Sequence, residues 1–260
     1  MKRGKELRGN TLVVVLVIIG VLVVTSILAV KFILPTLISK VVNTAIDTSL
    51  ESLNFDGAKS APISQDLSQN EGMFLQIGIN KGKISIDGKS QGDVINGEVQ
   101  YLGAQPTIDY QTDKDKMAFY TIKSSDQAGE NVILHLSQKT NARVDIGLAA
   151  GLIEINLTDL DIPILNVGTA AGAINVTLSS KKSTTANFGA AAGKINVSLP
   201  KRLEYRIKFA QAVGSSSFNA GEDLVKIENG YQTKGFDKAE IKADLNVGQA
   251  AGGFTLQTIE

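Results

Sequence analysis

The 260-residue sequence predicts an all-β protein, a β-solenoid with coils of about 21 residues, preceded by an N-terminal transmembrane α-helix. Three observations predict this architecture. An uncharged apolar run stands near the N-terminus, a glycine motif returns every 21 residues, and apolar and polar residues alternate within each copy of the motif. The length fits one large domain or two small ones, and a content of 43% hydrophobic residues suits a folded chain.

The composition excludes several classes of site and partner. The chain has no cysteine and one histidine, which excludes a disulfide scaffold, a thiolate zinc site, a cysteine nucleophile and a multi-histidine metal site. The net charge is zero, but six of the 26 basic residues lie within the first 40 positions. Residues 41–260 hold 20 basic and 25 acidic side chains, which is a net charge of −5. An acidic body without a basic stripe argues against nucleic-acid binding.

The N-terminal segment predicts a membrane anchor. Residues 11–30 carry no charge and are nearly all valine, leucine and isoleucine. A helix of this length spans the roughly 30 Å hydrocarbon core of a bilayer, so we assign residues 11–34 to a transmembrane helix whose partner is the lipid bilayer. More basic residues precede the run than follow it. The positive-inside rule therefore places the basic tail, residues 1–10, in the cytoplasm and the C-terminal part of this single-pass cell-membrane protein outside.

Two other interpretations of this segment stay open. A cleaved signal peptide is disfavoured because its apolar region would be only about 7–15 residues long and would end in a small-residue cleavage site. The stretch from Arg8 to Gly20 resembles the class III leader of type IV pilin-like proteins, in which Gly9 would be the processing site. The glutamate that such leaders usually carry five residues after the glycine would fall at Val14, so the sequence departs from that pattern.

The residues after the apolar run predict a second helix and a linker. Pro35 bends or ends the transmembrane helix. Apolar residues then recur at helical spacing, which predicts an amphipathic juxtamembrane helix over residues 35–53. Residues 54–71 are rich in Asp, Gly, Ser, Gln and Asn and predict a linker to an extracytoplasmic β-solenoid domain over residues 72–260.

The body of the chain repeats the pattern Val/Leu-x-Val/Ile-Gly-x-Ala-Ala-Gly-x-Ile-x-Val-x-Leu. A fixed internal period of this kind is typical of solenoids. Four copies are clear, one is weaker, and one around Ala210 and Gly214 is degenerate. The two glycines of a copy stand at 147 and 151, 168 and 172, 189 and 193, 248 and 252 and, in the weaker copy, 78 and 82.

The alternation within each copy predicts how the copies stack. After the second glycine, aliphatic residues point to one side of a strand and polar residues to the other. Stacked copies would place equivalent residues about 4.8 Å apart. We therefore expect amide ladders between Asn166 and Asn187 and between Asn175 and Asn196.

The ends of the repeat are less regular. Residues 90–143 contain strand-like runs and would form irregular coils or a cap, which a solenoid needs because open strand edges aggregate. The last copy, residues 249–260, would lie at one end of the stack. The competing architecture is an antiparallel sandwich of hairpins, which the constant period disfavours.

The repeated pattern behind an N-terminal membrane segment resembles the bacterial toast-rack domains of the DUF2154 type. These occur in LiaF-like proteins of the response to cell-wall antibiotics, in phage-shock-associated membrane proteins and in adhesin-like proteins. The resemblance covers roughly residues 72–260 and is clearest at residues 144–199. It implies a membrane-anchored β-repeat fold with a role in the cell envelope. LiaF-like proteins usually carry several membrane helices, whereas this sequence predicts one.

No residue pattern predicts a catalytic, cofactor-binding or metal site. His135 lies in a predicted strand without a second histidine, and we expect it to have a structural role. The acidic residues between 109 and 115 stand among lysines and lack the spacing of a calcium loop. Asp145 and Glu154 could be the carboxylate pair of a polysaccharide-active β-helix, but the next coil carries asparagine at both offsets, which favours the ends of polar ladders.

The sequence therefore predicts a non-enzymatic protein without a cofactor, which presents a rigid repeat surface for interaction or scaffolding. We expect a protein partner in the cell envelope and a role in sensing envelope stress or in organising the envelope. The alternative is a pilin-like or adhesin-type subunit of a surface appendage, for which a mature chain beginning at Asn10 would be evidence. The sequence does not indicate the oligomeric state.

Overall fold

A computed structural model describes residues 54–92, 94–139, 141–219 and 224–260. The predicted cytoplasmic tail, transmembrane helix and amphipathic helix, residues 1–53, lie outside the described residues. Within the described residues, no helix is long and apolar enough to cross a membrane, and the one helix is the short 3-10 helix η1 (Phe236–Lys238). The prediction of an all-β body is confirmed for this part of the chain.

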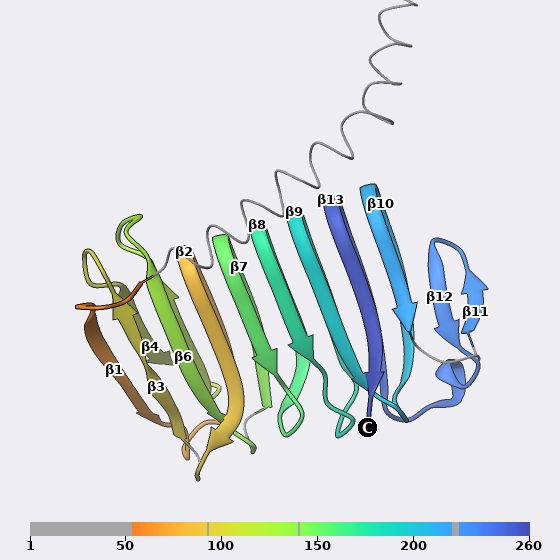
Figure 1. Cartoon of the computed structure of the whole chain (residues 1–260). Helices are drawn as coiled ribbons and strands as arrows, with labels where there is room; N and C mark the ends of the chain where they lie inside the picture. The colour runs from red at the N-terminus through yellow and green to blue at the C-terminus, as the bar shows by residue number, and fades with distance from the viewer. Residues whose placement is uncertain (1–53, 93, 140, 220–223) are drawn as a thin grey trace, which may run out of the picture.

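Thirteen strands of the described residues form one sheet. Figure 1 shows them standing side by side as a rack, with β1 near one end and β11 near the other. The strands are β1 (Lys59–Asp66), β2 (Gly72–Ser90), β3 (Val94–Tyr101), β4 (Thr107–Thr112), β5 (Met117–Lys123), β6 (Glu130–Ser137), β7 (Asn141–Asn156), β8 (Asp161–Thr177), β9 (Thr184–Pro200), β10 (Glu204–Asn219), β11 (Leu224–Ile227), β12 (Gly230–Thr233) and β13 (Lys242–Ile259).

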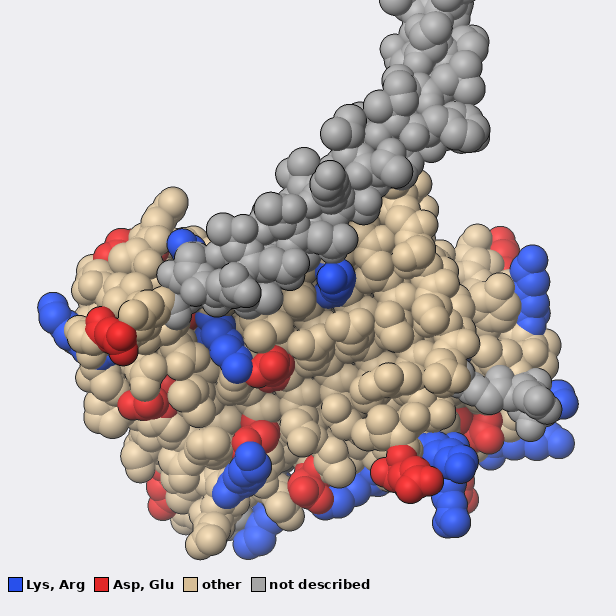
Figure 2. Space-filling view, in the orientation of Figure 1, with Lys and Arg blue, Asp and Glu red and all other residues tan. Residues whose placement is uncertain are grey.

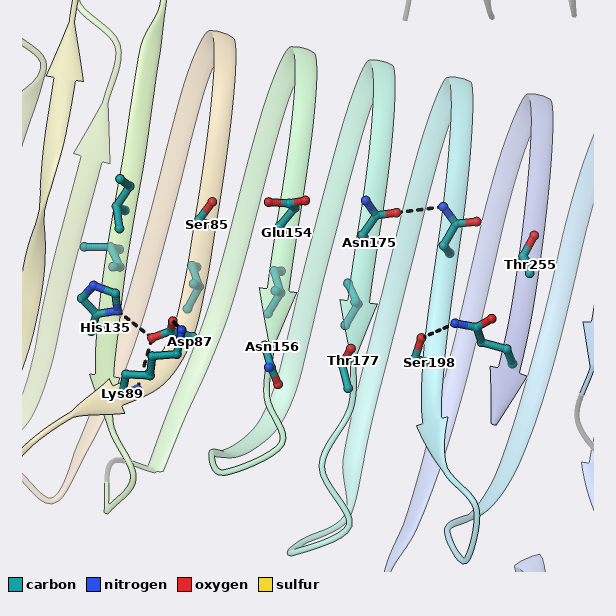
Figure 3. Close-up of a pocket in the computed structure, with 17 residues that line it drawn as sticks. Ser85, Asp87, Lys89, His135, Glu154, Asn156, Asn175, Thr177, Ser198 and Thr255 are labelled. Carbon is teal, nitrogen blue, oxygen red and sulfur yellow. Dashed lines mark hydrogen bonds and ion pairs between the residues drawn. The ribbon is translucent and has the colours of Figure 1, made fainter. Parts of the chain in front are cut away.

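The long central strands fold back on themselves and build two layers. β2, β7, β8, β9 and β13 contain 16 to 19 residues each, and the ribbons in Figure 3 fold back on themselves. We place the bend at the second glycine of the repeat, which has a positive φ in β2, β7, β8 and β13. We call the halves before the bend the rear layer and the halves after it the front layer, which lies nearer the viewer in Figure 3. In the regular coils a short turn leads from the front layer to the rear layer of the next coil.

Neighbouring central strands are parallel and in register. Gly147 pairs with Gly168 and Gly168 with Gly189, and the second glycines of these copies pair in the same way. The weaker copy in β2 aligns with β7 at both of its glycines. The predicted stacking of 21-residue coils is therefore confirmed, and parallel pairing excludes the sandwich of antiparallel hairpins for these strands.

The core lies between the two layers. In β8, Leu165 and Val167 of the rear half and Ile174 and Val176 of the front half are at most 3% exposed. Equivalent residues of the other coils join them in one continuous cluster. Each coil thus adds a rung of aliphatic side chains, and burial of each side chain stabilises the fold by roughly 1.5–3 kcal/mol.

The bend requires glycine because adjacent backbones touch there. Gly172 has a φ of 155°, in a region that side chains disfavour. A Cβ atom on Gly172 would overlap the carbonyl oxygen of Gly151, and one on Gly193 would overlap that of Gly172. We call this set of close-contact glycines the bend row; its members are Gly82, Gly151, Gly172, Gly193, Gly252 and Gly214.

Antiparallel strands cap the N-terminal end of the stack. β5 and β6 together form one interrupted coil, since β5 pairs with the rear half of β2 and β6 with its front half. β4 pairs antiparallel with β5, and β3 and β1 extend the sheet beyond β6. Within the predicted irregular region, residues 90–143, strands β3 to β6 thus form the interrupted coil and most of the cap.

The predicted linker over residues 54–71 is wrong in its central part, because this part is strand β1. β1 pairs with β3 along its whole length and buries Ala61 and Ile63 between more exposed residues. The strand is polar because it lies at an edge of the sheet and covers the core with one face only. An edge position also tolerates Pro62, which cannot donate a ladder hydrogen bond.

The position predicted for the last copy, residues 249–260, is also wrong. β13 does not end the stack but lies between β9 and β10. The physical reason lies in the inward side chains: β13 places Phe254 and Leu256 where β10 has Ser216 and Phe218. The more apolar copy takes the inner place, and β10, partly covered by β12 and β11, ends the row of full coils.

Candidate functional site

The candidate site is a groove on the outer surface of the front layer, which we call the front groove. Side chains of β6, β2, β7, β8, β9 and β13 line it, and its volume is about 530 Å³. The inward side chains of these strands fill the core, so the outward ones between them decide what the surface can bind. Figure 3 shows these outward side chains on successive strands.

The first row of the front groove consists of Ser85, Glu154, Asn175, Asn196 and Thr255, one residue on each strand. Each of them is half-buried, because neighbouring strands lie only about 4.8 Å apart. Asn196 Nδ2 donates a hydrogen bond of 2.8 Å to Asn175 Oδ1. This bond confirms one of the two predicted amide ladders.

A second row runs beside the first, nearer the turns. It consists of Asn156, Thr177, Ser198 and Gln257. Gln257 Nε2 donates a hydrogen bond of 3.0 Å to Ser198 Oγ. Over β8, β9 and β13 the two rows therefore offer amide and hydroxyl groups and no charge.

Charged residues gather at the β6–β2 end of the front groove, and Figure 2 shows acidic and basic side chains next to each other on this part of the surface. His135 Nδ1 lies 2.6 Å from Asp87 Oδ1, and Lys89 Nζ lies 3.0 Å from Asp87 Oδ2. Burial of the Asp87 carboxyl acts to raise its pKa. Hydrogen bonds from His135 and Lys89, together with the charge of His135, lower the pKa by more than burial raises it. The pKa of Asp87 therefore lies below its usual value. Nearby, Lys83 Nζ lies 2.6 Å from Glu154 Oε2. The two carboxylates in the groove are thus both paired with basic groups.

The pair of Asp87 and His135 could not be foreseen from the sequence. The two residues are 48 positions apart and meet because β2 and β6 are parallel neighbours in which they share a register position. The sequence shows neither the order of these strands nor their register. Among the residues that the structure describes, no group of three His, Cys, Asp or Glu side chains could hold a metal ion.

The other acidic residues considered in the sequence do not meet in one groove. Asp145 faces outward from the rear layer and Glu154 from the front layer, so they cannot act as a carboxylate pair on one substrate. Asp113 accepts hydrogen bonds of 2.9 Å from the backbone N–H groups of Asp115 and Met117. The cluster around Asp113 therefore builds the turn between β4 and β5.

The outer surface of the rear layer carries a longer ladder. Asn166 Nδ2 donates to Asp145 Oδ1 at 2.6 Å, Asn187 Nδ2 to Asn166 Oδ1 at 2.7 Å, and Asn246 Nδ2 to Asn187 Oδ1 at 2.9 Å. The predicted contact between Asn166 and Asn187 is confirmed, and Asp145 ends the ladder as an acceptor. The step to Asn246 exists because β13 lies next to β9.

The front groove can therefore act as a binding surface that works through hydrogen bonds. Its donors and acceptors stand at strand spacing on a rigid frame. Such a surface does not have to be ordered when a partner binds, which lowers the entropic cost of association. The paired charges at one end would give the partner a direction along the groove.

Comparisons with known proteins agree with this architecture. Residues 54–215 match the family described as the N-terminal domain of toast_rack, DUF2154. The structure is similar to that of a candidate cell adhesion protein from Clostridium sporogenes, with a TM-score of 0.68 and 21% sequence identity over 78% of this chain and 100% of the other. At this identity the likeness shows the fold alone. No curated protein matches the sequence.

Proposed function

Because the chain belongs to the toast-rack family, we propose that it is a non-enzymatic interaction and scaffold protein of the cell envelope, which binds a protein partner through the front groove. The observation that carries the proposal is the pair of uncharged polar rows across β8, β9 and β13. A solenoid presents such rows on a long rigid face, which suits binding. The role we infer is the sensing of envelope stress or the organisation of the envelope.

The proposed location rests on the N-terminal sequence. Residues 11–34 would anchor the chain in the cell membrane, with residues 1–10 in the cytoplasm and the β domain outside. The chain lacks cysteine, so a single introduced thiol can report the side of the membrane. In intact cells, a membrane-impermeant maleimide should label Ser64→Cys, which is exposed in β1, whereas Lys5→Cys should react only after permeabilisation. Labelling of Lys5→Cys in intact cells would contradict this orientation.

A photo-crosslinking experiment tests the front groove. A benzophenone amino acid at Asn175, expressed in the full chain in native membranes, should give an adduct with an envelope protein that mass spectrometry identifies. Asn166 is the matched control, since it is an asparagine of the same strand that faces outward from the opposite layer. Adducts of equal yield at both positions, or at neither, would reject the front groove as the binding surface.

The second candidate function is that of an adhesion module or a subunit of a surface appendage. The observations that favour it are the similarity to a candidate cell adhesion protein and the pilin-like stretch around Gly9. N-terminal sequencing of the mature chain separates the two functions. A chain that begins at Asn10 supports the appendage, and one that keeps residues 1–9 supports the anchored scaffold.

A further inference from the structure

The front layer ends in an open strand edge at β10. On one side, β13 pairs with β10 from Glu204 to Asn219, whereas on the other side β12 pairs only with residues 206–208. Among the described residues, no strand pairs with the outer side of residues 214–219, which we call the β10 edge. An unpaired strand edge is a template for another strand.

The other edges of the sheet carry features that oppose strand pairing. β1, the opposite edge of the front layer, contains Lys59, Pro62 and Asp66. The edges of the rear layer, β4 and β11, contain Asp109 and Lys226. Charges and proline on edge strands prevent edge-to-edge association. The β10 edge, Gly-Ser-Ser-Ser-Phe-Asn, has neither.

The β10 edge also leaves an aromatic side chain partly uncovered. Phe218 is half-buried, with its ring centroid 5.3 Å from that of Tyr231 and 5.8 Å from that of Phe254. The three serines at 215–217 are exposed. The apolar core therefore reaches the surface at this end of the stack, beside a strand that lacks a neighbour.

We propose that the β10 edge pairs antiparallel with the β10 edge of a second copy, around a two-fold axis at Ser216. This register places Ser216 opposite Ser216, Ser215 opposite Ser217, and Gly214 opposite Phe218 of the second copy. Cross-strand serines can exchange hydrogen bonds. Gly214 has no side chain, so the Phe218 ring of the second copy can lie over it and become covered. A two-fold interface needs such a self-complementary strand.

The position of the hairpin β11–β12 permits this arrangement. β12 pairs with residues 206–208 of the rear half, about 20 Å of strand away from the bend at Gly214. A two-fold axis perpendicular to the sheet inverts the second copy. The hairpins of the two copies then lie at opposite ends of the β10–β10 interface and do not block the two pairing strands.

The charges and the proline disfavour pairing between the β10 edge and β1 of a second copy. Pro62 would leave one ladder hydrogen bond unmade, and Lys59 and Asp66 would place charges in the β10–β1 interface. Pairing of β10 with β1 would also be head-to-tail and would continue into an open chain of molecules. Pairing of β10 with β10 closes at two copies.

Cysteine crosslinking tests the register, because the chain has no cysteine of its own. Under mild oxidation, the full-length Ser216→Cys variant in detergent should form a disulfide-linked dimer. Ser215→Cys and Ser217→Cys alone should crosslink at least ten-fold more slowly, and a mixture of the two should crosslink rapidly. Circular dichroism would verify that each variant is folded. Equal rates for the three single variants, or no crosslinking at all, would overturn the proposal.

Sedimentation velocity tests the association itself. The pairing involves only five residues per copy, residues 214–218, which is less than a standard interface, so we expect a dimer that dissociates on dilution. Ser216→Lys puts like charges opposite each other and should weaken dimerisation at least ten-fold. Ser64→Lys, an exposed serine on the opposite edge strand, should have no effect. The proposed two-fold dimer would be refuted if the chain stays monomeric at every concentration, or if Ser216→Lys and Ser64→Lys weaken the dimer equally.

Discussion

The two glycines of each coil form two rows, and the rows differ in whether the fold requires glycine there. In the bend row, a side chain would overlap the backbone of the next coil. The outer row consists of Gly78, Gly147, Gly168, Gly189 and Gly248, which face outward from the rear layer. A Cβ atom in the outer row would meet nothing closer than 3.9 Å, and no φ value there lies in the region that favours glycine. β10 carries Ala210 at this position.

A glycine that recurs in every repeat is therefore not always required by the fold. Both rows have the same period and the same residue, so the sequence gives them equal weight. Only the bend row is fixed by contact between backbones, while the described residues give no steric reason for glycine in the outer row. Substitutions by alanine can therefore separate the two rows.

The largest effect is expected for Gly172→Ala, in the middle of the bend row. Alanine would adopt a disfavoured φ and would overlap the carbonyl oxygen of Gly151, while Gly193 on the other side prevents the strand from moving away. We expect a loss of at least about 3 kcal/mol in the free energy of unfolding, or no folding. Urea unfolding followed by circular dichroism measures this loss. A loss below about 1 kcal/mol would show that the bend can move and that the two rows are alike.

A smaller effect is expected for Gly214→Ala, at the end of the bend row. The alanine would also have a disfavoured φ and overlap Gly252, but the outer side of the strand is open, so the strand can shift. We expect a loss of about 1–2 kcal/mol in the same unfolding assay, at a protein concentration too low for dimers. A loss as large as that of Gly172→Ala would mean that the position along the stack does not matter.

The sequence predicts the regular part of the fold because its signals there are local. The period of 21 residues sets the parallel register, and the alternation around Ile174 and Val176 sets which side is buried. The order of the strands is not local, since β13 and β10 compete for the place beside β9 and the outcome depends on which copy buries its inward residues better. The sequence did not reveal strand β1 either, because an edge strand with one covered face has a polar composition like that of a linker.

The candidate site also has one part that the sequence predicts and one part that it does not. The ladders at Asn175 and Asn166 follow from the period and could be predicted. The pair of Asp87 and His135 depends on an interrupted coil whose two halves, β5 and β6, lie against β2. No repeat marks that coil in the sequence, so the charged end of the front groove could not be derived before the strand order was known.

The interrupted coil offers a third test, because its bend position is occupied by Glu130 and not by glycine. Glu130 pairs with Gly82 of the bend row and is 1% exposed. Ser124 Oγ donates a hydrogen bond of 2.5 Å to Glu130 Oε1, whereas Oε2 has no hydrogen-bond partner among the described residues. Burial raises the pKa of Glu130; the Ser124 hydrogen bond offsets part of this, and the charge of Asp126 adds to it.

A raised pKa makes the contribution of Glu130 to stability depend on pH. The folded chain holds the proton to higher pH than the unfolded chain, so the stabilisation is complete below the unfolded pKa near 4.5 and is lost as pH rises through the folded pKa. We expect Glu130→Gln to be more stable than the parent chain at pH 7 and to lose less stability between pH 4.5 and pH 7. Thermal unfolding at several pH values measures this difference. Identical pH profiles for the two chains would show that the carboxyl ionises freely at this bend.

The smallest effect is expected for Gly168→Ala, the matched control for Gly172→Ala on the same strand. The nearest atom to a Cβ on Gly168 would be the carbonyl oxygen of Gly189, at 3.9 Å, which is an ordinary contact. Alanine also restricts the unfolded chain more than glycine does, so we expect no change or a gain of up to about 1 kcal/mol in the free energy of unfolding. Urea unfolding of the two variants side by side tests the difference between the rows directly. A loss of more than about 1 kcal/mol for Gly168→Ala would mean that the outer row is also constrained by the fold, and the distinction between the two rows would then fail.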